Sequence, residues 1–230
     1  MHKETNKLNI ETLKKKFDDL LPPFCRLPLL FTVILNFSVY FGSRLIAGNW
    51  THHNIETELD RQIPMAYWMV VIYFCCYIFW IVNYIYNARM DKTHCYRFLA
   101  ADWIAKVVCF IFYVGYPTTN TRPEIVGNDI FAELMRFLYK IDSADNLFPS
   151  IHCLVSWLCY IGIRGNKKVP LWFRVVSCIC ALAVCVSTVT TKQHVLYDVF
   201  AGIGLVELTY FITGKIVKSK TNEKETKEAN

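Results

Sequence analysis

Charge is scarce in this sequence and unevenly distributed. Asp, Glu, Lys and Arg make up 19% of the 230 residues, against about 25% in an average globular domain, while apolar residues reach 54%. The charged residues crowd the two ends and a few short segments, and long stretches between them carry none. This pattern excludes a disordered chain and a coiled coil, and it argues against an ordinary soluble domain.

Several familiar signatures are also missing. The sequence has no Walker loop, no glycine-rich dinucleotide motif and no internal repeat. Its ten cysteines never show Cys-x-x-Cys spacing, and most of them lie in apolar segments. We interpret them as small apolar residues, which excludes a disulfide scaffold.

What the sequence does contain is six apolar runs, each close to the length of a membrane-spanning helix. Such a helix needs about 20 mostly apolar residues. The runs cover residues 27–43, 62–88, 107–121 (extended inward by 99–105), 146–163, 175–191 and 199–214. None alternates as the strands of a membrane barrel would. The sequence therefore predicts an all-α, polytopic membrane protein: a polar segment (1–26), a six-helix membrane catalytic domain (27–214) and a disordered basic tail (215–230).

The distribution of Lys and Arg predicts the orientation of these spans. Six spans place both termini on one side, which collects 18 of the 25 basic residues, and the opposite side has five. By the positive-inside rule, both termini lie in the cytoplasm. The net charge of +6 is then a topology signal, and no nucleic-acid partner is expected.

Three short motifs are predicted to share the non-cytoplasmic face. They are Arg122-Pro123 after the third span, Pro149-Ser150-Ile151-His152 at the start of the fourth, and Thr191-Lys192-Gln193-His194 with Asp198 at the start of the sixth. A polar, helical stretch near residues 129–142 is expected between the first two.

Spacing gives these residues a chemical meaning. His194 and Asp198 are four residues apart, so on a helix a carboxylate holds one imidazole nitrogen and leaves the other free. Pro149 suits the first turn of a helix that Asn146 or a neighbour would cap, which places His152 in that turn.

The same face offers several groups that attract anions. Two helix N-termini favour a phosphate, and Arg122 and Lys192 add two full positive charges. The sequence therefore predicts a site for a phosphate ester, with no metal and no cofactor.

The three motifs, in this order, resemble those of the type 2 phosphatidic acid phosphatase superfamily of membrane lipid phosphatases and phosphotransferases. The resemblance covers about residues 100–214. Two cations of the superfamily pattern are absent, because Gly115 and Thr188 occupy their positions, and Ile151 replaces a glycine. The Thr-Lys-Gln-His-x-x-x-Asp form resembles the branch with inositol phosphorylceramide synthases and sphingomyelin synthase-like proteins.

The resemblance implies a two-step mechanism on a lipid phosphate. His194 would form a phosphohistidine, Asp198 would orient it, and His152 would act as general acid and then as general base. Arg122, Lys192 and Ser150 would hold the phosphoryl oxygens.

Three functions remain open at this stage. The first is hydrolysis of a phosphomonoester or pyrophosphate lipid at the outer face of a plasma membrane or its equivalent. The second is transfer of a phospho-head group to an acceptor. The third is a non-catalytic lipid-binding or transport protein. Membrane lipids are expected partners, and the sequence leaves the lipid and the oligomeric state undetermined.

Two further charged sites lie within the apolar runs. Asp102 and Lys106 are four residues apart and are predicted to pair, although Lys106 could also stand in for the missing motif lysine. Glu207 lies about 20 Å below His194 on a helix, so we interpret it as a structural, hydrogen-bonded acid.

Overall fold

The structure is a computed structural model that describes the backbone of residues 2–228 and the side chains of residues 11–217. Nearly all regular structure in this part is helical. The helices are α1 (His2–Leu20), α2 (Pro23–Ala47), α3 (Glu58–Gln62), α4 (Met69–Arg89), α5 (Lys92–Gly115), α6 (Ile130–Ile141), α7 (Ile151–Arg164), α8 (Leu171–Thr190) and α9 (Leu196–Glu228). The short strands β1 (His53–Asn54) and β2 (Thr118–Thr119) form one parallel pair.

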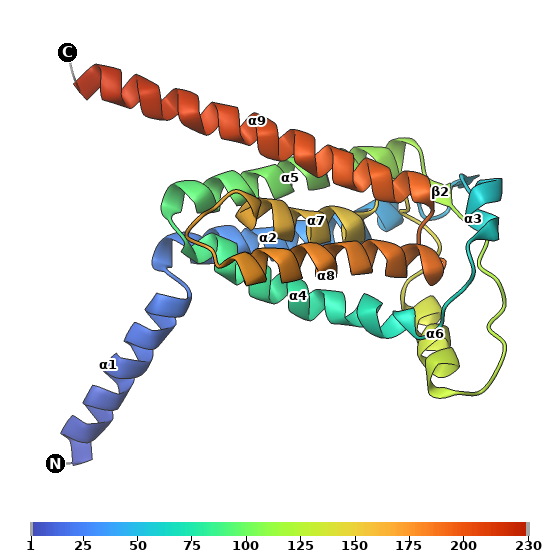
Figure 1. Cartoon of the computed structure of the whole chain (residues 1–230), viewed down its shortest axis with the longest axis horizontal. Helices are drawn as coiled ribbons and strands as arrows, with labels where there is room; N and C mark the ends of the chain where they lie inside the picture. The colour runs from blue at the N-terminus through green and yellow to red at the C-terminus, as the bar shows by residue number, and fades with distance from the viewer. Residues whose placement is uncertain (1, 229–230) are drawn as a thin grey trace.

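Six helices form a bundle, and the remaining elements lie at its two ends (Figure 1). Helices α2, α4, α5, α7, α8 and α9 pack against one another along its length. The short α3, α6 and β2 gather at one end, whereas α1 and the far end of α9 project from the other. The predicted helix in the long connecting segment is confirmed as α6, whose N-cap Asp129 accepts hydrogen bonds from the amides of Phe131 and Ala132.

Five helices are long and apolar enough to cross a membrane: α2, α4, α5, α8 and the Leu196–Val217 part of α9. Their outward faces carry large apolar side chains that are 60% to 87% exposed, including Leu27, Leu45, Ile78, Ile111, Ile179 and Phe200. Exposing so much apolar surface to water is unfavourable, whereas lipid tails solvate it. The prediction of a helical membrane protein is therefore confirmed.

Helix α7 differs from the other five bundle helices. It has 14 residues and is about 21 Å long, shorter than the roughly 30 Å hydrocarbon core. The predicted run began at residue 146, but Asn146 has a φ of 53° and lies in a loop, and Ser150 caps the helix. Because α4, α5, α8 and α9 surround α7, most of its side chains face protein.

A close approach between α7 and α9 fixes the end of the bundle that carries the predicted motifs. The Ser150 amide donates to the Asp198 carbonyl across 3.1 Å. A Cβ on Gly202 would lie 2.6 Å from the Ser150 carbonyl oxygen, so only glycine fits at this contact. The two helix starts are thereby held against each other.

The charged residues within the apolar runs form the contacts that were predicted: Asp102 and Lys106 pair with each other, and Glu207 is hydrogen-bonded. Lys106 Nζ donates to Asp102 Oδ2 across 2.9 Å. Glu207 accepts hydrogen bonds from Arg164 and from the Trp157 indole. The tail differs from the prediction, because α9 continues to Glu228 where a disordered segment was expected from residue 215.

Candidate active site

The structure brings the three motifs together at the end of the bundle near α3 and α6. Arg122 lies between β2 and α6, and His152 lies in the first turn of α7. His194 lies in the loop between α8 and α9, and Asp198 lies in the first turn of α9. Arg122, His152 and His194, up to 72 positions apart in the sequence, thus line one cavity.

The predicted contact between His194 and Asp198 is present. His194 Nδ1 lies 3.2 Å from Asp198 Oδ2, and Asp198 is fully buried. The same carboxylate oxygen accepts the Val195 amide, which folds the loop back onto the helix start. Burial lowers the pKa of His194, but its hydrogen bond to Asp198 and the charge of that carboxylate outweigh burial and leave the pKa raised. This contact leaves Nε2 as the free ring nitrogen.

His152 faces His194 across the same space. Their ring centroids are 5.7 Å apart and the rings are tilted by 55°. Tyr73 and Trp80 hold the other side of the His152 ring, with centroids at 4.7 Å and 5.5 Å. Among the described residues, the His152 nitrogens have no hydrogen-bond partner, so the aromatic rings fix its position without occupying its proton-transfer atoms.

Arg122 is a half-buried cation at the same location. It donates to the carbonyls of Asp142 and Ser143 and, across 2.7 Å, to Gln193 Oε1. Burial lowers the pKa of its guanidinium, although the charge of Asp142 opposes this shift. Its Nε is buried and has no partner among the described residues, so the group retains capacity for an anion.

Asp142 and Gln193 are site residues that sequence reasoning missed. Asp142 accepts hydrogen bonds from Tyr40 and Tyr73, both at 2.8 Å. Burial raises the pKa of Asp142, but the neighbouring His152 and the two tyrosine hydroxyls lower it more, so the carboxylate is ionised. No local sequence pattern marks this residue, because its partners come from α2 and α4.

Lys192 and Ser150 occupy positions other than the predicted ones. Lys192 Nζ donates to the backbone carbonyls of Asp60 and Ile63 across 2.7 Å and 2.8 Å, on the side of α3. The Ser150 hydroxyl is fully buried and accepts the Cys153 amide as the α7 N-cap. Neither side chain lines the cavity described next, because backbone groups already hold both, distant ones for Lys192 and a local one for Ser150.

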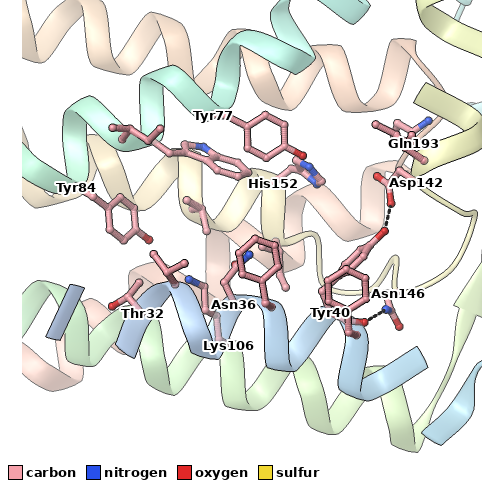
Figure 2. A pocket seen from close by; sticks show the side chains of 18 of the residues that line it. Thr32, Asn36, Tyr40, Tyr77, Tyr84, Lys106, Asp142, Asn146, His152 and Gln193 are labelled. Carbon is pink, nitrogen blue, oxygen red and sulfur yellow. Dashed lines mark hydrogen bonds between the residues drawn. The ribbon is translucent and has the colours of Figure 1, made fainter. Parts of the chain in front are cut away.

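A cavity of about 810 Å³ opens onto the two histidines and runs down between α2, α4, α5 and α7. Figure 2 shows Asp142, Gln193 and His152 toward one end of it and Thr32 and Tyr84 at the other. The walls of the far part are mostly apolar and include Leu29, Val33, Ile81 and Ile85. A ligand that fits must combine a polar head with an apolar body.

Two findings limit which groups the site could hold. Among the described side chains, no three His, Cys, Asp or Glu residues are grouped as metal ligands. The two positions where the superfamily pattern has a cation carry none here. The Thr188 hydroxyl donates to the Cys185 carbonyl, and a Cβ on Gly115 would meet open space. Of the cations in the cavity wall, Arg26, Lys106 and Arg122, it is Arg122 that bonds Gln193, the residue next to His194.

No protein-family model, no curated protein and no solved structure matches this chain. The chemistry of the site therefore has to be inferred from its own residues.

Proposed function

We propose that this protein is an integral membrane lipid-phosphate phosphatase that works through a phosphohistidine. The observation that carries the proposal is the pair His152 and His194 at the polar end of an apolar cavity. Their ring centroids are 5.7 Å apart, and the Asp198 carboxylate contacts His194. A nucleophile held by a carboxylate, with a second imidazole opposite, is the arrangement that group transfer in two displacement steps requires.

In the first step, His194 Nε2 attacks phosphorus while the bond from phosphorus to the lipid oxygen breaks. Protonated His152 donates its proton to the leaving alcohol, and Asp198 stabilises the charge that develops on the His194 ring. In the second step, neutral His152 takes a proton from water, the hydroxide oxygen bonds to phosphorus, and the phosphorus–nitrogen bond breaks. Inorganic phosphate leaves, and both imidazoles return to their starting states.

The surrounding charges support these roles. Burial and the charge of His194 disfavour the imidazolium form of His152, and ionised Asp142 opposes them; this imidazolium is the form that acts as general acid. Arg122 supplies the positive charge that a phosphoryl group needs. The cavity accommodates the lipid chains below, so we propose a phosphomonoester or pyrophosphate lipid as substrate.

We also propose the topology in which α7 counts as a sixth crossing, shielded from lipid by its four neighbours. Both termini then lie in the cytoplasm, as the distribution of Lys and Arg predicts, and the histidine pair lies at the non-cytoplasmic face. Cysteine labelling of variants at Trp50 and Lys167 with an impermeant reagent in intact cells tests this: only the Trp50 position should react.

The test of the activity uses purified protein and a panel of lipid phosphates, with release of inorganic phosphate as the readout. His194→Ala should abolish release, and His152→Ala should reduce it by about 100- to 10,000-fold. Thr209→Val is the matched control, because this buried hydroxyl bonds only its own helix. Normal activity of either histidine variant would refute the mechanism.

Head-group transfer is the second candidate, and the size of the cavity favours it. A volume of about 810 Å³ leaves room for an acceptor besides the substrate head group, whereas water needs only about 30 Å³. In that reaction the acceptor hydroxyl replaces water in the second step. Adding diacylglycerol or inositol to the assay and analysing products by mass spectrometry separates the two reactions. Binding without turnover on every substrate would instead indicate a non-catalytic lipid-binding protein.

A further inference from the structure

A second group of polar side chains lies deeper in the cavity, and the proposed chemistry does not use it. It consists of Asn36 on α2, Tyr84 on α4 and Lys106 on α5. Figure 2 shows these three side chains between the helices, away from Asp142 and Gln193. We call them the inner polar cluster.

The inner polar cluster holds hydrogen-bonding groups that lack partners. Lys106 is 2% exposed, and its one hydrogen bond within the described part of the chain goes to Asp102. Within the described part of the chain, the buried Tyr84 hydroxyl and Asp102 Oδ1 lie next to each other without forming a hydrogen bond of good geometry, and the half-buried Asn36 amide forms none. Such groups are expensive in an apolar environment unless a ligand or water satisfies them.

The charges of the cluster indicate what kind of group it would bind. Lys106 is also 5.9 Å from the centre of the Tyr84 ring, and Asp102 cancels its charge. A second anion would therefore gain little here. The free groups are mainly donors, namely ammonium N–H, phenol O–H and amide N–H, so they suit a neutral acceptor oxygen.

The depth of the cluster fits a particular part of a lipid. Tyr40 bonds Asp142 at the polar end of the cavity, and Asn36 lies one helical turn deeper on α2, about 6 Å along the axis. In an acyl lipid phosphate, only a few covalent bonds separate the phosphate from the first acyl carbonyl. A phosphate at His194 would then place that carbonyl at the level of Asn36, the outermost member of the cluster, whereas Tyr84 lies deeper, about 16 Å along α4 from Tyr73.

We infer that the inner polar cluster binds the acyl carbonyl oxygens of the lipid and so selects ester- or amide-linked lipids over ether-linked or polyprenyl ones. The identification of the ligand as a lipid phosphate rests on the proposed function. The carbonyl preference is a binding property and can be measured without turnover.

The experiment compares diacyl phosphatidate with its dialkyl ether analogue of equal chain length. Each displaces a fluorescent lipid from purified protein in detergent, and the ratio of their apparent Kd values is the readout. The variants are Asn36→Leu, and Asp102→Leu combined with Lys106→Met. The double variant removes both charges together, because a buried aspartate left alone would endanger folding. Thr209→Val is the control.

Wild-type protein and the control should bind the diacyl lipid about tenfold more tightly, since the ether analogue leaves buried donors unpaired. Both cluster variants should bring the ratio close to one. Equal binding of the two lipids by wild-type protein would overturn the inference, and so would an unchanged preference in both folded variants. A preserved preference in a protein that releases no phosphate would refute the proposed function and leave this inference standing.

Discussion

The placement of Lys192 leads to the sharpest prediction. The sequence predicts that this lysine binds substrate phosphate, whereas its ammonium bonds the carbonyls of Asp60 and Ile63. Asp60 in turn accepts the Leu196 amide at the start of α9 across 2.8 Å. We therefore predict that Lys192 acts by fixing the loop that carries His194.

The magnitude follows from the two contacts that Lys192→Met removes. A hydrogen bond that involves a charged group contributes about 1.5–3 kcal/mol, and losing both should destabilise the protein by about 3–6 kcal/mol. For a chain of this length that corresponds to a Tm lower by roughly 6–24 °C. Because His194 lies two residues further along, kcat should fall as well, while KM changes little.

Thermal unfolding in detergent and phosphate-release kinetics measure these effects. The matched control is Arg61→Met. It removes an exposed cation from α3, the helix whose Asp60 carbonyl Lys192 bonds, and should leave both Tm and kcat nearly unchanged. An increase in KM with an unchanged Tm would place Lys192 on the substrate phosphate and refute the argument from the structure.

Four further predictions concern the site and the contact between α7 and α9. Asp198→Asn should lower kcat by about a thousandfold or more, because it loses the charge that orients and stabilises His194. Activity that needs neutral His194 should rise with pH through a pKa above 6.5, and in the residual activity of Asp198→Asn this rise should move to lower pH; a pH profile of kcat checks both. Asp142→Asn should reduce kcat about tenfold at neutral pH, because the general acid His152 loses a stabilising charge. An unchanged kcat across the pH profile would contradict this role of Asp142. Gly202→Val should destabilise the protein by about 1–3 kcal/mol in thermal unfolding, since its side chain meets the Ser150 carbonyl, whereas Gly204→Val meets open space and serves as control.

Much of the fold could be predicted from the sequence, because long apolar runs have few alternatives in a membrane. Each of the six runs overlaps one bundle helix, and the extra helix α6 was expected as well. The boundaries were harder to predict. The fourth run overestimated α7, since hydropathy does not register that Asn146 turns the chain and Ser150 begins the helix. The remainder of that run is loop.

The candidate site divides in the same way. The sequence by itself determined the apolar runs and the histidine motifs, and helical spacing predicted the contact between His194 and Asp198. The structure forms this contact from the loop before α9, where the Asp198 carboxylate also accepts the Val195 amide. Which cations reach the cavity was decided only by tertiary structure. Lys192 donates to the carbonyls of Asp60 and Ile63. Asp142 is held at the site by hydrogen bonds from Tyr40 of α2 and Tyr73 of α4. Local patterns encode the period of a helix, but they carry no record of which distant backbone group satisfies a buried charge.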